Sequence, residues 1–264
     1  MKKKAIPRHG GILLDAVRDP MGLVEVVQHG ERRSLHFGSA IEQSSHVPDM
    51  PDWLQFDYCR QLLFASVFPV VADEVLLLGL GAGTLARYLL RHAGPSLRLD
   101  AVEYREAVAD MAYRHFDLPI DPRLDIYIAT AEQYLNAYDR QWNVIVVDLY
   151  DAEGMNEEPA RLRFLDTCRE RLAPGGVMAI NLWRTNADEY AFMLEQLDQA
   201  FAGRLLLADA DDANTVAYCF ATDVPVLSAA AFQRQLHDRA KALSFDGEAF
   251  LAGLYAPNGE TRKN

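Results

Sequence analysis

Val75-Leu-Leu-Leu-Gly79-Leu-Gly81-Ala-Gly83 joins a continuous apolar run to three closely spaced glycines, and helix-forming residues follow directly. An uninterrupted apolar run is typical of a strand buried on both faces of a parallel sheet. Glycines at the turn after such a strand allow a tight bend and a close approach of a ligand to the backbone at the next helix N-terminus. The stretch therefore predicts a strand–turn–helix unit of an α/β fold.

The alternation of strand and helix continues along the chain from this unit. The predicted strands lie at 75–80, 97–102, 124–128, 144–148, 177–182, 205–208 and 215–221, and the predicted helices at 53–68, 86–91, 107–115, 131–137, 160–172, 190–201 and 228–243. Five strand–helix units followed by a terminal hairpin predict a doubly wound α/β sheet with right-handed crossovers.

The N-terminal part follows a different pattern. Residues 11–38 alternate between apolar and polar and are divided by Asp19-Pro20, Gly22 and His29-Gly30, which indicates a short antiparallel meander. Residues 39–52 are polar and contain prolines, so we expect a boundary loop there. We therefore divide the chain into a small N-terminal β-strand domain, 1–52, and a Rossmann-like catalytic domain, 53–264.

The composition limits the possible partners. There are 26 Lys and Arg against 38 Asp and Glu, a formal net charge of −12, which argues against a nucleic-acid partner. The three cysteines are far apart and form no CxxC pair, so neither a disulfide framework nor a metal site is predicted. No apolar run approaches the roughly 18 residues that span a bilayer. We expect a cytoplasmic protein that does not bind membranes.

The glycine motif favours one kind of nucleotide. Nicotinamide enzymes use GxGxxG, whereas this chain has GxGxG with Thr84 at the next position, the spacing found with S-adenosyl ligands. Glu103 ends the next predicted strand, about where a carboxylate accepts the ribose hydroxyls. Thr130 and Ala131 follow the third strand, where adenine would lie, although Thr130 is equally explained as a helix N-cap. These residues predict a sheet of the class I S-adenosylmethionine-dependent methyltransferase type.

Two carboxylates follow the fourth strand of the predicted sheet, Asp148 and Asp151. Ligands of open α/β sheets bind outside the carboxyl ends of the strands, so both should face the same crevice as the glycines. Such a pair suits a cationic amine, because one carboxylate can take its proton as general base and the other can hold a second cationic centre. The alternative interpretation is that these carboxylates only cap a helix and lie solvated in a loop.

Together these segments resemble the spermidine synthase family, the polyamine aminopropyltransferases. The matching segments are Gln43-Ser44, Phe56-Asp57-Tyr58-Cys59-Arg60, Val75 to Gly83, Asp100 to Glu103, Thr130-Ala131, Asp148 with Asp151, and Leu172 to Gly176. The resemblance implies a Rossmann-like catalytic domain, a small β domain that takes part in a homodimer, and decarboxylated S-adenosylmethionine as co-substrate without a metal.

The resemblance also implies roles for individual residues. Asp148 would accept the proton, and Asp151 and Tyr58 would bind the acceptor amine, such as putrescine. Glu103 would hold the ribose and Gln43 the nucleoside end of the donor.

Four positions depart from the family pattern. Ala82 stands where the family has an aspartate for the donor's amino group, Thr130 replaces an aspartate at the adenine position, and Cys59 replaces a histidine or glutamine. Residues 208–215 replace a Pro-Thr-Tyr-Pro segment that lines the acceptor pocket. The nucleoside half of the predicted site is thus closer to the family than the amine half.

These departures leave two alternatives to aminopropyl transfer. One is a methyltransferase that uses S-adenosylmethionine, since an alanine at position 82 does not repel the donor carboxylate. The other is a non-catalytic nucleoside- or polyamine-binding homologue.

Overall fold

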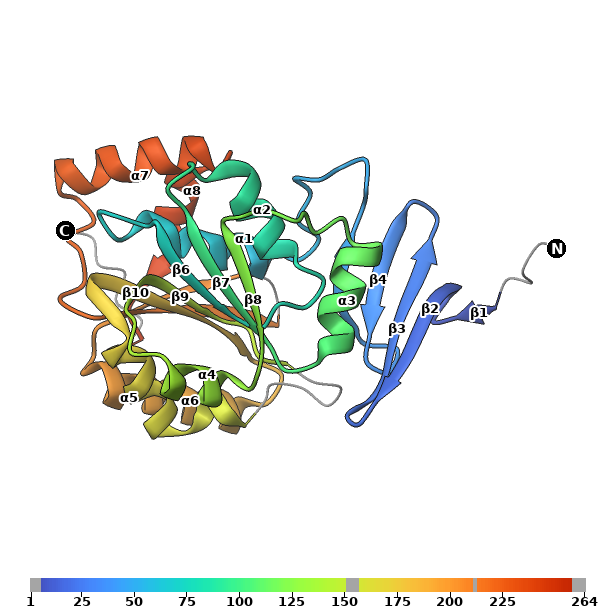
Figure 1. The fold of residues 1–264 in the computed structure, drawn as a ribbon. Coiled ribbons are helices and arrows are strands. Elements are labelled where there is room, and N and C mark those ends of the chain that lie inside the picture. Colours follow the sequence, from blue (N-terminus) through green and yellow to red (C-terminus); the bar gives the residue numbers. More distant parts are fainter. Residues whose placement is uncertain (1–5, 151–156, 211–212, 258–264) are drawn as a thin grey trace.

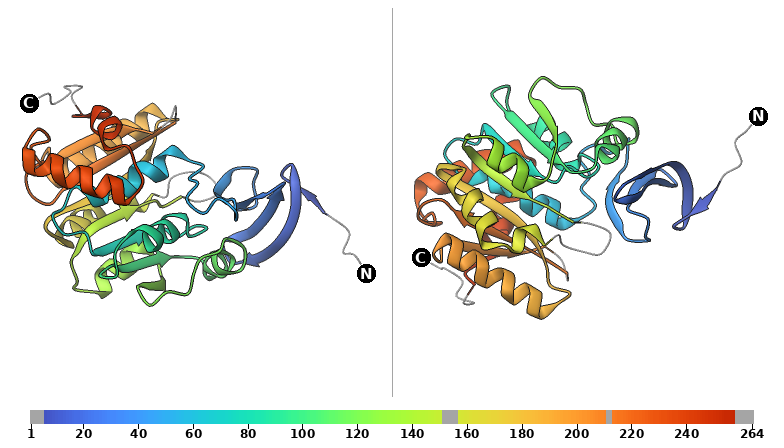
Figure 2. Two further views of the ribbon diagram at one scale, coloured as in Figure 1. Left: turned by 90° about the horizontal axis from the view of Figure 1, so that it is seen from above. Right: turned by 60° about the horizontal axis from the view of Figure 1, so that its bottom comes forward.

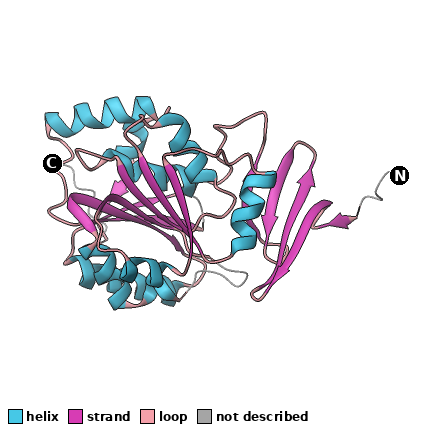
Figure 3. Cartoon of the chain, viewed as in Figure 1, coloured by secondary structure: helices cyan, strands magenta, loops and turns pink. Residues whose placement is uncertain are grey.

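The computed structural model describes residues 6–150, 157–210 and 213–257. These residues form a five-stranded sheet near the N-terminus and an eight-stranded sheet in the rest of the molecule (Figure 1). The N-terminal part consists of strands, whereas helices cover the larger sheet (Figure 3).

The N-terminal sheet is antiparallel, and its strands follow one another in chain order. It consists of β1 Pro7–Arg8, β2 Gly11–Asp19, β3 Gly22–His29, β4 Arg32–His36 and β5 Glu42–His46. Strands β2, β3 and β4 of this sheet form the meander predicted for residues 11–38.

The larger sheet has the strand order β13-β11-β12-β10-β9-β6-β7-β8. Its strands are β6 Glu74–Leu78, β7 Arg98–Glu103, β8 Leu124–Ile128, β9 Trp142–Val147, β10 Leu172–Trp183, β11 Leu205–Asp209, β12 Asn214–Phe220 and β13 Leu254–Tyr255. The five strands from β10 to β8 run parallel, and β12, β11 and β13 each pair antiparallel with their neighbours. This is the predicted doubly wound α/β sheet with its terminal hairpin.

The chain reverses direction across the sheet between β6 and β9. It passes from β6 to β7 and β8 on one side and then returns to β9 and β10 on the other. The carboxyl ends of strands at such a switch point form the usual ligand site of open α/β sheets.

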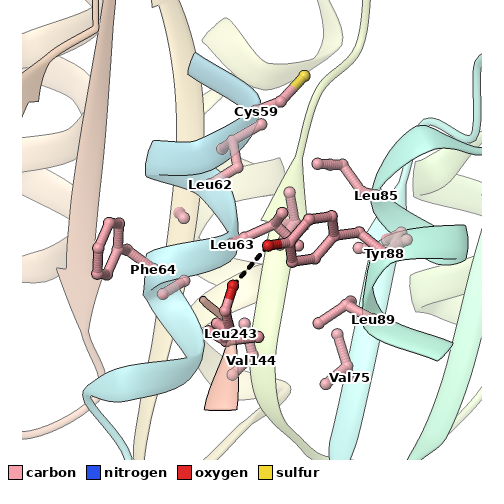
Figure 4. Packing of buried hydrophobic residues seen from close by; sticks show 14 of the residues in the cluster. Cys59, Leu62, Leu63, Phe64, Val75, Leu85, Tyr88, Leu89, Val144 and Leu243 are labelled. Carbon is pink, nitrogen blue, oxygen red and sulfur yellow. Dashed lines mark hydrogen bonds between the residues drawn. The ribbon is translucent and has the colours of Figure 1, made fainter. Parts of the chain in front are cut away.

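Helices cover both faces of this sheet. One face carries α1 Asp57–Phe64, α2 Thr84–His92, α7 Ala230–Ala242 and α8 Gly247–Ala252, and the other carries α4 Ala131–Ala137, α5 Leu162–Glu170 and α6 Ala187–Phe201 (Figure 1). Figure 4 shows the packing on the first face, where leucines of α1 and α2 meet Val75 and Val144 of the strands. The Tyr88 hydroxyl there donates a hydrogen bond to the Leu243 carbonyl.

The N-terminal sheet lies at one end of the larger sheet, with α3 Glu106–His115 between them (Figures 1 and 2). A small apolar cluster joins the two parts and contains Val24, Val26, Leu35, Ala82, Val108, Met111 and Phe116. Arg105 adds a bidentate ion pair, because its Nε and one terminal nitrogen each lie 2.8 Å from a carboxylate oxygen of Asp19. The glycine turn therefore packs directly against the N-terminal sheet.

Three sequence predictions differ from the structure. The predicted loop 39–52 contains β5, which pairs with β4 although it is polar, because its backbone completes the ladder at Ser34 and Leu35. The helix predicted from Trp53 begins at Asp57 instead. Residues 247–255, for which the sequence suggested no element, form α8 and the edge strand β13.

Candidate functional site

The glycine turn and Glu103 form one connected unit at the carboxyl ends of β6 and β7. Gly79, Gly81 and Gly83 all have positive φ, at 99°, 54° and 72°. The Glu103 carboxylate accepts hydrogen bonds from the backbone N–H groups of Leu80 and Gly81 at 3.3 Å. The predicted ribose-binding carboxylate thus lies directly against the glycine turn.

Glu103 is a buried carboxylate with several backbone partners. Its second oxygen accepts a hydrogen bond from the Arg105 N–H at 2.9 Å. Burial raises the pKa of Glu103 above its ordinary value, although the backbone N–H groups of Arg105, Gly81 and Leu80 oppose that rise. A carboxylate held in this way has a fixed orientation, as recognition of a vicinal diol requires.

Asp148 lies directly after β9, on the other side of the switch point from β7. Its N–H donates to the Leu78 carbonyl at 2.9 Å, which holds it beside the end of β6. Its carboxylate accepts a hydrogen bond from the Asn181 amide at 3.0 Å. Burial raises the pKa of Asp148 to about 6, and the Asn181 hydrogen bond limits the rise. A carboxyl with this pKa is ionised at neutral pH and is a stronger base than an ordinary aspartate.

Two tyrosines, Tyr58 and Tyr150, interact electrostatically with Asp148. Burial and then the negative charge of Asp148 raise the pKa of Tyr58 on α1 well above its ordinary value, and the same two causes raise that of Tyr150. The Tyr150 hydroxyl donates to the Asn181 carbonyl oxygen at 3.0 Å. Both tyrosines are therefore neutral, and the structure brings Tyr58 near Asp148, as predicted.

Cys59 also lies close to this group. Its thiol is buried, and its pKa is raised by burial first and then by Asp148. This cysteine is therefore a neutral thiol and not a nucleophile.

Gln43 lies on β5, next to the glycine turn. The adjacent Ser44 side-chain oxygen accepts a hydrogen bond from the Ala82 N–H at 3.3 Å. Ala82 itself is fully buried in the apolar cluster that joins the two sheets. An aspartate at this position would place a carboxylate among apolar side chains, at a considerable free-energy cost.

Thr130 is the N-cap of α4. Its side chain accepts a hydrogen bond from the Gln133 N–H, and the Gln133 side chain accepts one from the Thr130 N–H. Ala131 is buried directly after it. The Ala129 N–H donates to the Glu103 carbonyl, so this helix start lies beside the end of β7.

One predicted residue, Asp151, lies outside the described residues. Two buried polar residues were not predicted from the sequence: Asn181, which donates a hydrogen bond to Asp148, and Asn214, which donates one to Asn181. An asparagine within the apolar run of residues 177–182 is the signal that could have identified the first of them. Among residues 6–150, 157–210 and 213–257 there is no cluster of three or more His, Cys, Asp or Glu suited to a metal, and no helix there is long and apolar enough to cross a membrane.

Gly79→Ala tests the contact between the glycine turn and Asp148. A Cβ at Gly79 would lie 2.2 Å from the Asp148 carbonyl oxygen, so the two strand ends must separate. We expect a lower melting temperature and a loss of nucleoside binding, measured by thermal unfolding and by calorimetric titration.

Gly175→Ala is the matched control for Gly79→Ala. Gly175 has a φ of +75°, but a Cβ there meets nothing within 4 Å. This variant therefore carries the cost of positive φ alone. If both variants bound nucleoside equally well, the contact would not matter for the site.

Comparison with known proteins shows which family this chain belongs to. The model of the spermine/spermidine synthase domain matches residues 64–202. A polyamine aminopropyltransferase from Neisseria meningitidis is 29% identical over 247 residues, which cover 91% of this chain and 92% of the relative.

Solved structures share the fold. A spermidine synthase in complex with the transition-state analogue AdoDATO superposes with a TM-score of 0.76 at 17% identity, over 93% of this chain and 86% of that one. Human methyltransferase-like protein 13 in complex with SAH superposes with a TM-score of 0.61 at 19% identity, over 71% and 90% of the two chains. The fold is thus common to both kinds of enzyme. Because the family model matches more than half of its length, the chain belongs to the spermine/spermidine synthase family and is a transferase.

Proposed function

We propose that this chain transfers an aminopropyl group from decarboxylated S-adenosylmethionine to a small amine such as putrescine, with Asp148 as the general base. The observation that carries the proposal is the carboxyl group of Asp148, whose pKa is about 6, beside the glycine turn. The family match and the aminopropyltransferase relative support the same reaction.

The reaction needs a proton acceptor, because an alkylamine is protonated at neutral pH. Asp148 takes one proton from the acceptor ammonium, which frees the nitrogen lone pair. That lone pair attacks the aminopropyl carbon bonded to the sulfonium. A C–N bond forms, the C–S bond breaks, and its electron pair stays on sulfur, so methylthioadenosine leaves as a neutral thioether.

The nucleoside of the donor would lie along the glycine turn. Glu103 accepts the ribose hydroxyls, Gln43 contacts the nucleoside end, and Thr130 and Ala131 border the adenine. Support comes from the hydrogen bonds that tie Glu103 to the turn and from the position of Thr130 beside the end of β7.

The acceptor amine would lie between Asp148 and α1. Tyr58 contacts it with a neutral hydroxyl, and Asp151 holds a second cationic centre. The closeness of Tyr58 to Asp148 supports this placement.

We also propose the organisation that the resemblance implies. The chain would be a cytoplasmic homodimer without a nucleic-acid or membrane partner, and the boundary between its two domains would fall at residue 52.

Ala82 does not favour decarboxylated S-adenosylmethionine over S-adenosylmethionine as the donor. Since its methyl group is buried in the apolar cluster, this position offers the donor neither an attractive nor a repulsive charge. Methyl transfer from S-adenosylmethionine is therefore the second candidate function, and the fold shared with human methyltransferase-like protein 13 is compatible with it.

Thermal unfolding with single ligands separates these functions. A ligand at about 100 times its dissociation constant adds about 2.7 kcal/mol, a shift of several degrees for a protein of this size. We expect methylthioadenosine and decarboxylated S-adenosylmethionine to raise the melting temperature. Stabilisation by S-adenosylmethionine and S-adenosylhomocysteine alone would favour methyl transfer. Binding of the donor without product in the presence of any amine would favour the non-catalytic homologue.

A further inference from the structure

Three polar residues lie on the three neighbouring strands β9, β10 and β12 or directly after them, on the face that α1 covers: Asp148 follows β9, Asn181 lies near the end of β10, and Asn214 begins β12. In β9 and β10, Val147 pairs with Ile180, so Asp148 and Asn181 are the next residues on these two parallel strands. In β10 and β12, Asn181 pairs with Val216, and Asn214 lies two residues from Val216. Because side chains alternate along a strand, all three polar side chains lie on one face.

The three side chains form a continuous chain of hydrogen bonds. The Asn214 amide nitrogen donates to the Asn181 side-chain oxygen at 2.8 Å, and the Asn181 amide nitrogen donates to Asp148 at 3.0 Å. Both asparagines are at least 94% buried, with exposures of 6% and 2%. Water therefore cannot readily replace either bond.

The carboxylate of Asp148 determines the direction in which these hydrogen bonds are donated. An ionised carboxylate only accepts hydrogen bonds, so Asn181 must turn its NH₂ group toward Asp148. Its oxygen then faces β12 and needs a donor there. Asn214 supplies that donor, and this second hydrogen bond favours the orientation in which the Asn181 NH₂ group points to Asp148.

We propose that Asn214 is a positioning residue that acts through Asn181 to fix the orientation and the ionised state of the Asp148 base. The inference deepens the proposed function and rests on it. Asn214 does not itself contact the base, so it is distinct from the groups that would meet substrate.

Other groups also influence Asp148, but they do not take the place of the hydrogen bonds from Asn214 to Asn181 and from Asn181 to Asp148. Tyr58 and Cys59 on α1 and Tyr150 after β9 each interact electrostatically with Asp148. All three are neutral at physiological pH because burial raises their pKa values. Arg184 after β10 pairs with Asp209 of β11 at 3.2 Å. Among the described residues around Asp148, the Asn181 amide is thus the donor that favours its charged form.

Asn214→Leu tests the proposal, because leucine has a similar volume but cannot donate. We expect the acidic limb of the kcat/KM profile for methylthioadenosine release to move up by about 0.5–1 pH unit. At pH 6 the activity then falls about two- to fivefold, since half of the wild-type Asp148 is ionised there, and near pH 9 the difference disappears. A profile with its acidic limb at the wild-type position would overturn the proposal.

A double-mutant cycle tests the route through Asn181. In an Asn181→Leu background, Asn214→Leu should change kcat/KM and the acidic limb no further, because the link to the base is already lost. Additive effects of the two substitutions would mean that Asn214 acts by another route, which would contradict the proposal.

Asn143→Leu is the matched structural control. The Asn143 side chain accepts a hydrogen bond from the Glu74 N–H at 3.0 Å, near the opposite end of β9. We expect Asn143→Leu to lower the melting temperature without moving the pH profile of kcat/KM. Were it to move the limb as far as Asn214→Leu does, general loosening of the sheet would explain both effects, and the proposal would fail.

A readout without turnover separates this inference from the proposed function. The ¹³C resonance of the Asp148 carboxyl group, assigned with Asp148→Asn, reports its pKa directly. A higher pKa in Asn214→Leu supports the positioning role, and an unchanged one refutes it. If the wild-type chain formed no methylthioadenosine, the proposed function would fail while this titration still decided the role of Asn214.

Discussion

Asp148→Asn should lower kcat/KM for methylthioadenosine release by about 10²–10⁴-fold, the contribution typical of a general base. Asparagine keeps the shape and can still accept the hydrogen bond from Asn181, but it cannot take the proton of the acceptor amine. Donor binding should change little, because Glu103 and the glycine turn are untouched. Steady-state kinetics and calorimetric titration with methylthioadenosine measure the two effects.

Asp125→Asn is the control for this substitution. Asp125 is an exposed aspartate on β8 of the same sheet, and its replacement should leave the kinetics unchanged. If Asp148→Asn retained more than a tenth of the wild-type kcat/KM, Asp148 would not be the base.

Asp148→Asn should also raise the free energy of unfolding at neutral pH. The pKa of Asp148 is about 6 in the folded state against 3.8 ordinarily, so between these values the folded state binds more protons than the unfolded state. The free energy of unfolding therefore falls as the pH rises from about 4 through about 6. Asparagine removes this penalty, and Asp148→Asn should melt at a higher temperature than wild type at pH 7.5, with the difference lost near pH 4.

Glu103→Gln should weaken binding of methylthioadenosine by about 10- to 100-fold. Hydrogen bonds to a charged group contribute about 1.5–3 kcal/mol, and every 1.4 kcal/mol is a factor of ten. In wild type, backbone N–H groups donate to both carboxylate oxygens of Glu103. Glutamine replaces one of these oxygens with an NH₂ group, so a donor would face a donor there. Calorimetric titration measures the affinity.

Glu106→Gln is the matched control for Glu103→Gln. Glu106 lies three residues later, is exposed, and belongs to the first turn of α3. Its replacement should leave the affinity within about twofold. Equal affinities of wild type and a folded Glu103→Gln would show that this carboxylate does not hold the ribose.

The part of the candidate site around the glycine turn could largely be predicted from the sequence, because local patterns encode it. A buried strand, a glycine turn and a helix stand next to one another in the chain, and Glu103 follows at a spacing that one crossover determines. The structure confirms these elements and shows the hydrogen bonds between Glu103 and the turn.

The surroundings of Asp148 could not be predicted in the same way. Asn214 is linked to Asp148 only through Asn181 of β10, and that link depends on the register of β9, β10 and β12. The strand β5 was also missed, since its polar residues show no apolar alternation and its pairing with β4 forms only in the folded sheet. Long-range pairing, rather than local preference, decides both features.

The most direct test of aminopropyl transfer is the product analysis of wild-type protein with decarboxylated S-adenosylmethionine and a panel of small amines. We expect methylthioadenosine and the aminopropylated amine in equal amounts, detected by mass spectrometry, with putrescine among the acceptors. No methylthioadenosine with any amine, or methylated amine from S-adenosylmethionine instead, would contradict the proposed reaction.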